Sequence, residues 1–510
     1  MVGKTYKVGP QNENKVKEDC IVSSKFSPMR RSEIDHWDAQ VDVLVVGFGA
    51  AGACSAIAAH DSGAKVMIVE AASDAGGSTA LSSAELYLGG GTRVQKAMGY
   101  DDTADAMYDY LMMSNGPQAS AEKTRRYCDE SVEHFDWLVE QGVPFKDSEY
   151  PGRAMMALTD DCLLFTGSEK AWPFKDQIPA APRGHNLYVE GDNGGPLFMK
   201  IMADAVAKRG VEHRFETRVL KLIVTEESGS LRVCGAVIRQ DMQEKFVEAT
   251  KGVMLCSGGF VMNEDMVKQY APELLKASVP IGNPNDTGSG IQMGMSVGGA
   301  VINMHEGFVS LPYYPPATLT YGILVNAQGQ RFINEDAYHG RVGAACLRQV
   351  GGPVYFVMNV EDYEGYETQS YLGSPIGGTG ETVDELAAEL SLPDGQLQNC
   401  IETFNRFAKE GQDPLFHKDA AWLKPLEPPL VALDCTPGNG TFYPYFTLGG
   451  LDTTVDGQVL TAGGEVIPGL YAAGRTACGV PRRGDGYASG SSVGDASFSG
   501  RVAGLHIAKS

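Results

Sequence analysis

One segment near the N-terminus, residues 41–70, constrains the fold of this chain more than any other feature. A β-branched, apolar run (41–46) meets the turn Gly47-Phe-Gly-Ala-Ala-Gly52, an alanine-rich stretch ends at Gly63, and a second apolar run (65–69) leads to Glu70. Such apolar runs are typical of buried parallel strands, and the alanine-rich stretch between them is typical of a helix. A strand, a G-x-G-x-x-G turn, a helix and a strand in this order predict a βαβ unit that binds a dinucleotide.

Each glycine of the turn has its own expected role. Gly47 permits the tight turn, Gly49 lets a pyrophosphate approach the backbone, and Gly52 allows the helix to pack closely on the strand. The phosphates would then lie on the free N–H groups at the positive end of the helix. Glu70 is placed to accept hydrogen bonds from ribose hydroxyls, which favours an unphosphorylated ribose, as in FAD or NAD.

A glycine- and serine-rich stretch after Glu70 favours FAD over NAD. Gly76-Gly-Ser-Thr-Ala80 is followed by Ser82-Ser-Ala84 and by Gly89-Gly-Gly91. Loops of this composition would line a long buried cofactor. The sequence has no second strand–turn–helix module with a following acid, so we expect no built-in nicotinamide domain. FAD is the expected cofactor.

Length, charge and cysteine spacing narrow the class of protein. A length of 510 residues suits two to four domains. The formal net charge of −22 disfavours nucleic acid as a partner, because phosphate backbones would be repelled. The 10 cysteines lie far apart, which disfavours disulfide frameworks and metal sites. The sequence has neither an apolar run of about 18 residues nor a signal-peptide core in residues 1–39, so we expect a cytoplasmic protein with at most peripheral membrane contact.

The chain is expected to be α+β, with a Rossmann-like FAD-binding domain that an α+β substrate-capping domain interrupts. The expected parts are an extension (1–39), the first part of the FAD-binding domain (40–288), the capping domain (289–438) and a return segment (439–510). The expected helices are 122–141, 195–209, 381–390, 398–409 and 494–509, and the expected strands include a meander at 218–224, 231–239 and 245–250 and a separate buried strand at 253–259.

Several motifs together resemble one flavoprotein family, which includes fumarate reductase and succinate dehydrogenase flavoprotein subunits, urocanate reductases and 3-ketosteroid dehydrogenases. Besides the glycine turn with Glu70, the motifs are Gly76–Thr79, Cys256–Phe260, Asp286–Gly290, Gln330–Glu335, Thr447–Gly450, Gly469–Gly474 and Gly500–Gly504. The resemblance runs from about residue 42 to residue 504. It implies an FAD domain interrupted by a capping domain, with catalysis at their junction.

Departures from the family pattern indicate the substrate class. Dicarboxylate reductases of the family place a His before a Thr-Met-Gly-Gly segment, where this chain has Phe446, and an Arg after the Asn-Glu pair, where it has Tyr338 or His339. A carboxylate substrate needs cationic or bidentate partners, so these changes argue against fumarate or succinate. Tyr338 and Tyr487 match the tyrosines of 3-ketosteroid dehydrogenases, and the segment 487–491 (Tyr-Ala-Ser-Gly-Ser) resembles the Δ4-(5α) type.

The resemblance also implies a set of site residues. Tyr487 with the amide of Ser491 would polarise a ketone, Ser489 would take a proton, and Tyr338 would act as its relay or activator. Phe308, Tyr445, Phe446 and Ser491 would contact the substrate. The expected FAD-binding residues are Gly47, Gly49, Ala50, Ala51, Gly52, Glu70, Ala71, Gly77, Ser78, Thr79, Ser82, Ser83, Ala84, Val219, Ser257, Gly258, Asp286, Gly474, Ser491, Ser492 and Val493. FAD is expected to bind non-covalently, and no metal is expected.

The expected reaction is FAD-dependent dehydrogenation of a 3-ketosteroid between C4 and C5, with an external electron acceptor. A proton would leave C4, and a hydride would pass from C5 to flavin N5. Three alternatives stay open: a 3-ketosteroid Δ1-dehydrogenase, a fumarate- or urocanate-type reductase of an unsaturated acid, and a non-enzymatic FAD-binding electron-transfer protein.

Overall fold

The computed structural model describes residues 24–227 and 229–510 of the chain, and its largest sheet has nine strands. The strand order is β1-β8-β9-β10-β2-β3-β7, with β21 beside β10 and β20 beside β21. The strands are β1 (Met29–Arg30), β2 (Ala39–Val46), β3 (Val66–Val69), β7 (Glu212–Arg214), β8 (Arg218–Glu227), β9 (Ser230–Gln240), β10 (Gln243–Leu255), β20 (Gln458–Leu460) and β21 (Val466–Ala472). The expected βαβ unit is present, because β2 and β3 pair in parallel and α1 (Ala50–Asp61) connects them.

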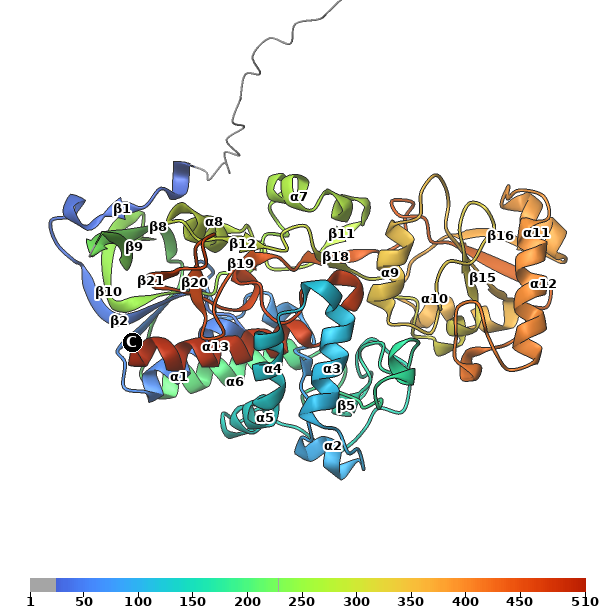
Figure 1. Ribbon diagram of the computed structural model, residues 1–510, viewed down its shortest axis with the longest axis horizontal. Helices are drawn as coiled ribbons and strands as arrows, with labels where there is room; N and C mark the ends of the chain where they lie inside the picture. Colours follow the sequence, from blue (N-terminus) through green and yellow to red (C-terminus); the bar gives the residue numbers. More distant parts are fainter. Residues whose placement is uncertain (1–23, 228) are drawn as a thin grey trace, which may run out of the picture.

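Three helices pack together against this sheet: α1, α6 (Gly194–Lys208) and α13 (Ser491–Lys509) (Figure 1). Glycines allow α13 to approach α1 closely. A Cβ atom at Gly500 would lie 2.3 Å from the Ala51 carbonyl oxygen, and one at Gly504 would lie 2.3 Å from the Ser55 carbonyl oxygen. Since no other residue fits at such distances, these two positions fix α13 against the helix of the βαβ unit.

One expected pair of strands is a single strand in the structure. The predicted strand 245–250 and residues 253–255 of the predicted strand 253–259 both belong to β10, which changes register between Ala249 and Gly252 and ends at Leu255. Gly252 has a φ of +151°, and a Cβ atom there would lie 2.5 Å from the Gly469 carbonyl oxygen. Gly252 is therefore at a bulge, and the chain continues through it in the same sheet.

The predicted helix 122–141 is two helices, α4 (Ala121–Asp129) and α5 (Ser131–Glu140). The break at Glu130 lets both helices contact α13. Tyr127 and His134 each place a ring edge-on to Phe498, at centroid distances of 5.2 and 5.5 Å. Tertiary packing therefore interrupts a helical pattern that is continuous in the sequence.

The other predicted helices are present, with small shifts at their ends. α6 (predicted 195–209), α11 (Val383–Glu389), α12 (Gln396–Lys409) and α13 match their predictions, although α13 begins at Ser491 and not at residue 494. The remaining helices and short strands are α2 (Arg93–Ala97), α3 (Ala104–Asn115), α7 (Glu264–Tyr270), α8 (Ser289–Ser296), α9 (His339–Leu347), α10 (Tyr366–Gln369), β4 (Leu86–Tyr87), β5 (Leu163–Leu164), β6 (Gly184–His185), β12 (Val301–Ile302) and β19 (Gly450–Leu451).

A separate four-stranded antiparallel sheet lies at the far end of the molecule, together with α11 and α12 (Figure 1). Its order is β14 (Ile323–Val325), β15 (Tyr355–Asn359), β17 (Leu430–Asp434) and β16 (Ile376–Gly380). The sheet falls within the expected capping domain, whose boundaries of 289 and 438 stay a prediction. Between the two large sheets lies a small one, of β11 (Val279–Pro280), β18 (Pro444–Thr447) and β13 (Gly307–Val309) (Figure 1).

The described part of the expected N-terminal extension, residues 24–39, takes part in the main sheet. β1 pairs in parallel with β8, and Ile34 is buried. Residues 1–23 of that extension lie outside the described residues. Among the residues that the structure describes, no helix is long and apolar enough to span a membrane, and no cluster of His, Cys, Asp and Glu could hold a metal ion.

Candidate active site

A cavity of about 560 Å³ runs from the glycine turn after β2 to the N-terminus of α13. Most of the predicted cofactor residues line it: Gly47, Gly49, Ala50, Ala51, Glu70, Ala71, Gly77, Ser78, Thr79, Ser82, Ser83, Val219, Ser257, Gly258, Asp286, Gly474, Ser492 and Val493. Gly52, Ala84 and Ser491 are buried but do not line the cavity. One continuous space therefore connects the predicted nucleotide site to the predicted reaction site.

The glycine turn has the geometry that its sequence predicts. Gly47 has a φ of +104°, and a Cβ atom at Gly52 would lie 1.9 Å from the Gly47 carbonyl oxygen. The Glu70 carboxylate accepts hydrogen bonds from the amides of Phe48 (2.7 Å) and Ala72 (2.8 Å). Glu70 thus holds the turn as well as lining the cavity.

A second loop, residues 76–80, is held in place by the buried acid Asp286. The Ser78 hydroxyl donates to the Asp286 carboxylate, and the Asn283 amide donates to Ser78 Oγ at 2.8 Å. Burial raises the pKa of Asp286 to about 6, against the opposing effect of the Ser78 hydrogen bond. The Thr79 hydroxyl accepts from the Ala50 amide at the start of α1 (3.3 Å). The loop 76–80 is therefore fixed beside the positive end of α1.

The three predicted catalytic side chains come together at the other end of the cavity. The hydroxyls of Tyr338 and Ser489 are hydrogen-bonded at 2.6 Å. The Tyr487 hydroxyl donates to Ser492 Oγ (2.7 Å) and accepts from the Ser492 amide (3.1 Å). Burial raises the pKa of both tyrosines, so both hydroxyls are protonated at neutral pH. Tyr487 and Ser489 line the cavity, whereas Tyr338 lies behind Ser489.

The structure pairs Tyr487 with Ser492, and not with Ser491 as the sequence interpretation had it. The Ser491 amide donates to the Ala488 carbonyl at 3.1 Å, because the chain turns at Gly490 (φ +87°) before α13 begins. Its N–H is therefore engaged. The amide that lies beside the Tyr487 hydroxyl belongs to Ser492, one position later.

Aromatic rings lie around the hydroxyls of Tyr487 and Ser492. Phe308 packs against Phe446 and Tyr487, each at a centroid distance of 4.8 Å. Of the predicted substrate residues only Phe446 lines the cavity; Phe308 lies behind it, and Tyr445 is buried in β18 outside the lining. The wall at this end thus combines the rings of Phe446 and Tyr487 with hydroxyl groups.

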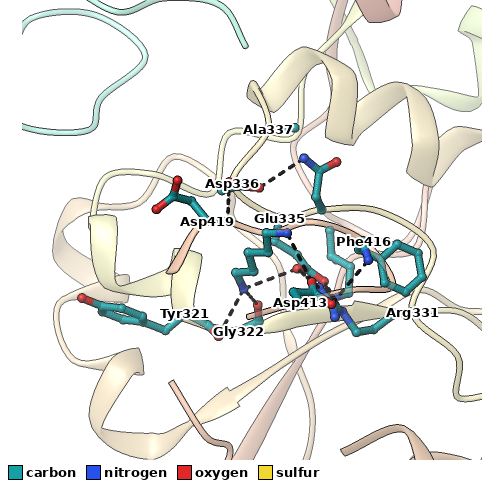
Figure 2. Close-up of polar contacts among 12 residues, drawn as sticks. Tyr321, Gly322, Arg331, Glu335, Asp336, Ala337, Asp413, Phe416 and Asp419 are labelled. Atoms are coloured by element: carbon teal, nitrogen blue, oxygen red, sulfur yellow. Dashed lines mark hydrogen bonds and ion pairs between the residues drawn. The ribbon is translucent and has the colours of Figure 1, made fainter. Parts of the chain in front are cut away.

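A buried ion cluster positions the loop that carries Tyr338 (Figure 2). The Glu335 carboxylate pairs with Arg331 (2.7 Å) and Lys418 (3.3 Å), and Lys418 also donates to the Gly322 carbonyl (2.6 Å). Burial opposes ionisation of Glu335, but the charges of Arg331 and Lys418 outweigh it and lower its pKa. The Gln330–Glu335 motif therefore fastens the Tyr338 loop to the four-stranded sheet.

The cavity wall also contains Glu85 and Arg475, which the sequence interpretation did not assign, and His339, one of the two residues at the position of the family's Arg. His339 Nδ1 is hydrogen-bonded to the Ser310 hydroxyl at 2.6 Å, and burial lowers its pKa to about 3, so it is neutral and does not replace a cationic Arg. Glu85 and Arg475 belong to no spacing pattern, and only the position of Arg475 directly after the glycine motif 469–474 could have pointed to it.

Comparisons with known proteins agree with this geometry. Residues 42–490 match the model of the FAD binding domain family. The chain belongs to this family of flavoproteins. It is similar to the solved 3-ketosteroid-Δ4-(5α)-dehydrogenase of Rhodococcus jostii, with 39% identity, a TM-score of 0.90, and coverage of 95% of this chain and 100% of the other. This likeness confirms the resemblance that the motifs indicated, and the α+β flavoprotein fold is as expected.

Two curated relatives of the flavoprotein are more distant. The 3-oxo-5-alpha-steroid 4-dehydrogenase of Comamonas testosteroni is 26% identical, over 86% of this chain and 93% of its own length. The NADH:fumarate oxidoreductase of Klebsiella pneumoniae is also 26% identical, over 97% of this chain. The flavoprotein spans 50% of the length of that relative.

The cavity of the flavoprotein fits FAD in its chemistry. The Ser257 hydroxyl and Arg475 Nε, both from residues that line the cavity, have no protein partner among the described residues. Buried polar atoms are normally hydrogen-bonded, so these two groups are available to a bound molecule. Together with the N-terminus of α1 and the glycine turn, they form a cradle for a long polar and aromatic cofactor. The flavoprotein is an FAD-dependent oxidoreductase.

Proposed function

We propose that this flavoprotein dehydrogenates 3-ketosteroids, introducing the double bond between C4 and C5. One observation carries the proposal: the hydroxyl pair Tyr338–Ser489 and the pair Tyr487–Ser492 lie at one end of an apolar, aromatic-walled cavity. Such a wall suits a flat hydrocarbon skeleton with a single polar end. The similarity to the Rhodococcus and Comamonas steroid dehydrogenases supports this choice.

The ketone would be polarised by Tyr487 and Ser492. A C–H beside a carbonyl becomes acidic only when the oxygen that gains negative charge is stabilised. The Ser492 amide donates to the Tyr487 hydroxyl at 3.1 Å and that hydroxyl donates to Ser492 Oγ at 2.7 Å, so a bound ketone oxygen would accept from both groups in place of these two hydrogen bonds. The amide also lies at the positive N-terminal end of α13, which favours an enolate-like oxygen.

The proton from C4 would be taken by Ser489. Neither a serine nor a tyrosine is a strong base near neutral pH, so Ser489 can accept a proton only while it passes its own to a neighbour. Tyr338, at 2.6 Å, is the neighbour that the structure provides. Bound FAD would supply the two-electron acceptor for the hydride that leaves C5.

The proposed function includes non-covalent FAD and an external electron acceptor. Of the described residues that line the cavity, His339 is the only histidine, and its Nδ1 is held by Ser310. The cytoplasmic location and the absence of more than peripheral membrane contact stay predictions.

A reductase of an unsaturated acid is the second candidate, and Arg475 is the observation that favours it. Arg475 lines the cavity and has an unpartnered Nε, and a guanidinium can bind a carboxylate. Dehydrogenation between C1 and C2 of the same steroids is the third, since it needs the same ketone polarisation.

Anaerobic titration of the purified yellow protein separates these candidates. A 3-keto-5α-steroid should bleach the flavin and yield the 4-ene, and deuterium at C4 and C5, but not at C1 and C2, should slow the bleaching. Deuterium effects at C1 and C2 would favour the Δ1 reaction. Reoxidation of the reduced flavin by fumarate- or urocanate-like acids, with no response to steroids, would overturn the steroid assignment.

A further inference from the structure

A buried carboxyl group in the cavity wall has no place in the reaction described above. Glu85 is 3% exposed, lines the cavity together with Tyr487 and Ser489, and its Oε1 has no hydrogen-bond partner among the described residues. Its neighbour Glu169 is equally buried, but both of its oxygens are bonded, to the Tyr87 hydroxyl (2.8 Å) and the Gly167 amide (2.9 Å). Both oxygens of Glu169 thus have partners, whereas one oxygen of Glu85, Oε1, has none.

The backbone holds Glu85 in this position at some conformational cost. Ala84, the residue before it, has a φ of +49°, which residues other than glycine rarely adopt. Such conformations persist where the surrounding structure enforces them, and they concentrate at active sites. Gly490 lies against this segment, since a Cβ atom there would lie 2.7 Å from the Tyr87 amide nitrogen and 3.2 Å from the Glu85 carbonyl carbon. The segment 85–87 is thus packed directly against the turn that carries Ser489.

Thr166 connects the Glu85 carboxyl group to Ser489. A Cβ atom at Gly184 would lie 2.5 Å from Glu85 Oε1 and 2.7 Å from Thr166 Oγ1, so both oxygens face the same bare glycine. The Thr166 hydroxyl donates to the Ser489 carbonyl (3.0 Å), and the Ser489 amide donates to the Thr166 carbonyl (2.9 Å). The carboxyl group and Ser489 therefore belong to one connected cluster.

The electrostatics of this cluster favour proton exchange near neutral pH. Burial raises the pKa of Glu85 to about 8; the Thr166 hydrogen bond opposes this rise and the Glu169 charge adds to it. Two other titratable groups from packed elements face Glu85: burial raises the pKa of Tyr338 and of Tyr487, and the Glu85 charge raises each further. Burial raises the pKa of Glu169 as well, and the charge of Arg183 opposes that rise. A general base works best when its pKa lies near the working pH.

We propose that the Glu85 carboxylate is the proton acceptor in which the Tyr338–Ser489 relay ends. This role rests on the proposed steroid dehydrogenation. The C4–H bond breaks, its proton goes to Ser489 Oγ, the Ser489 proton moves through Tyr338, and an O–H bond forms at Glu85. FAD, when bound, would supply the oxidant that takes the electron pair of the C5–H bond as hydride. Glu85 acts through Ser489 and is a positioning and proton-storing residue that does not touch the substrate.

The rate of flavin bleaching by saturating 3-keto-5α-steroid, measured anaerobically from pH 6 to 10, tests this role. In the wild-type protein the rate should rise with pH through a midpoint near 8, because only the carboxylate can accept the proton. In E85Q the rate should fall by about 10²-fold and lose this rise, while the flavin content stays unchanged. E85D should recover the rise. E169Q, the matched buried acid, should keep the rise with its midpoint shifted to lower pH.

A second measurement does not depend on a variant. Infrared difference spectra of the wild-type protein at pH 9, before and after reduction by the steroid, should show a new protonated carboxyl band. Absence of this band, or an E85Q variant with the wild-type rate and midpoint, would overturn the role of Glu85 alone. A wild-type flavin that no 3-ketosteroid bleaches at any pH would overturn the proposed function, and the role of Glu85 with it.

Discussion

The Tyr338 hydroxyl lies 2.6 Å from the Ser489 hydroxyl, although 151 positions separate the two residues in the chain. Tyr338 precedes α9, in a loop fastened to the four-stranded sheet through Glu335, whereas Ser489 precedes α13, which packs on the main sheet. The hydrogen bond therefore joins the two parts of the molecule at the cavity. A pair assembled in this way depends on the relative position of both sheets.

Replacing Tyr338 with Phe removes one hydroxyl from this pair and leaves the ring. We expect the rate of steroid-dependent flavin bleaching to fall by about 10²-fold, because Ser489 would lose the neighbour that takes its proton. FAD content should not change. The comparison is Tyr321→Phe, whose ring packs on Trp422, and this variant should keep the wild-type rate. Equal rates in Tyr338→Phe and wild type would remove Tyr338 from the mechanism.

Local sequence was sufficient to predict the glycine turn. The turn at Gly47 and the packing of Gly52 follow from short-range backbone demands, and the structure shows both, whereas the ribose contact of Glu70 stays a prediction. The break at Glu130 and the continuous β10 could not be foreseen in this way, because contacts with α13 and with Gly469 decide them.

The reaction half of the site needed the family resemblance, since no periodicity connects Tyr338 to Ser489. The resemblance implies the Ser491 amide as oxyanion donor, but in the structure that amide donates to the Ala488 carbonyl, and the amide beside the Tyr487 hydroxyl is that of Ser492. Glu85 gave no signal, because an isolated acid in a sequence does not show whether it is buried.

Gly52 should be essential for cofactor binding. A methyl group at Gly52 would lie 1.9 Å from the Gly47 carbonyl oxygen, so Gly52→Ala must move the turn that faces the cofactor. We expect the purified variant to contain less than a tenth of the wild-type flavin, measured as the ratio of visible to ultraviolet absorbance. Gly463→Ala is the control, because its Cβ would contact only Thr461 Oγ1, at 3.6 Å. Full flavin content in Gly52→Ala would contradict the assigned turn geometry.

Acid should destabilise the protein below about pH 6.5 through its buried histidines. Burial lowers the pKa of His134 to about 3, of His185 to about 4 and of His339 to about 3. The unfolded chain binds protons at these residues below about pH 6.5 while the folded chain does not, so stability is lost as the pH falls. Each histidine should contribute a loss of about 2 kcal/mol between pH 8 and pH 5.

The measurement is the free energy of unfolding in urea as a function of pH. His134→Gln should lose less stability on acidification than the wild type. Only two histidines, and not three, would then bind a proton in the unfolded chain but not in the folded chain. His36→Gln provides the comparison, since the His36 side chain is 70% exposed. An identical pH dependence in His134→Gln and wild type would show that His134 is not buried as a neutral ring.

We expect the position of the Tyr338 loop to depend on Glu335 more than on any other residue. Glu335→Gln leaves the buried Lys418 ammonium without its carboxylate and leaves Arg331 with Asp413 alone. Breaking a buried ion pair in this way costs about 3–5 kcal/mol. Because the lowered pKa of Glu335 stabilises the folded state only while the carboxylate is ionised, wild type and variant should converge as the pH falls through the acid range.

The loss of stability in Glu335→Gln should be confined to the four-stranded sheet and the loop that carries Tyr338. We expect hydrogen exchange to rise in β14 and β15, flavin content to stay unchanged, and the bleaching rate to fall because Tyr338 is no longer held 2.6 Å from Ser489. Glu361→Gln removes an exposed partner of Lys424 and should change the unfolding free energy by less than about 1 kcal/mol. If Glu335→Gln were as mild as Glu361→Gln, the ion cluster would not be what positions the Tyr338 loop.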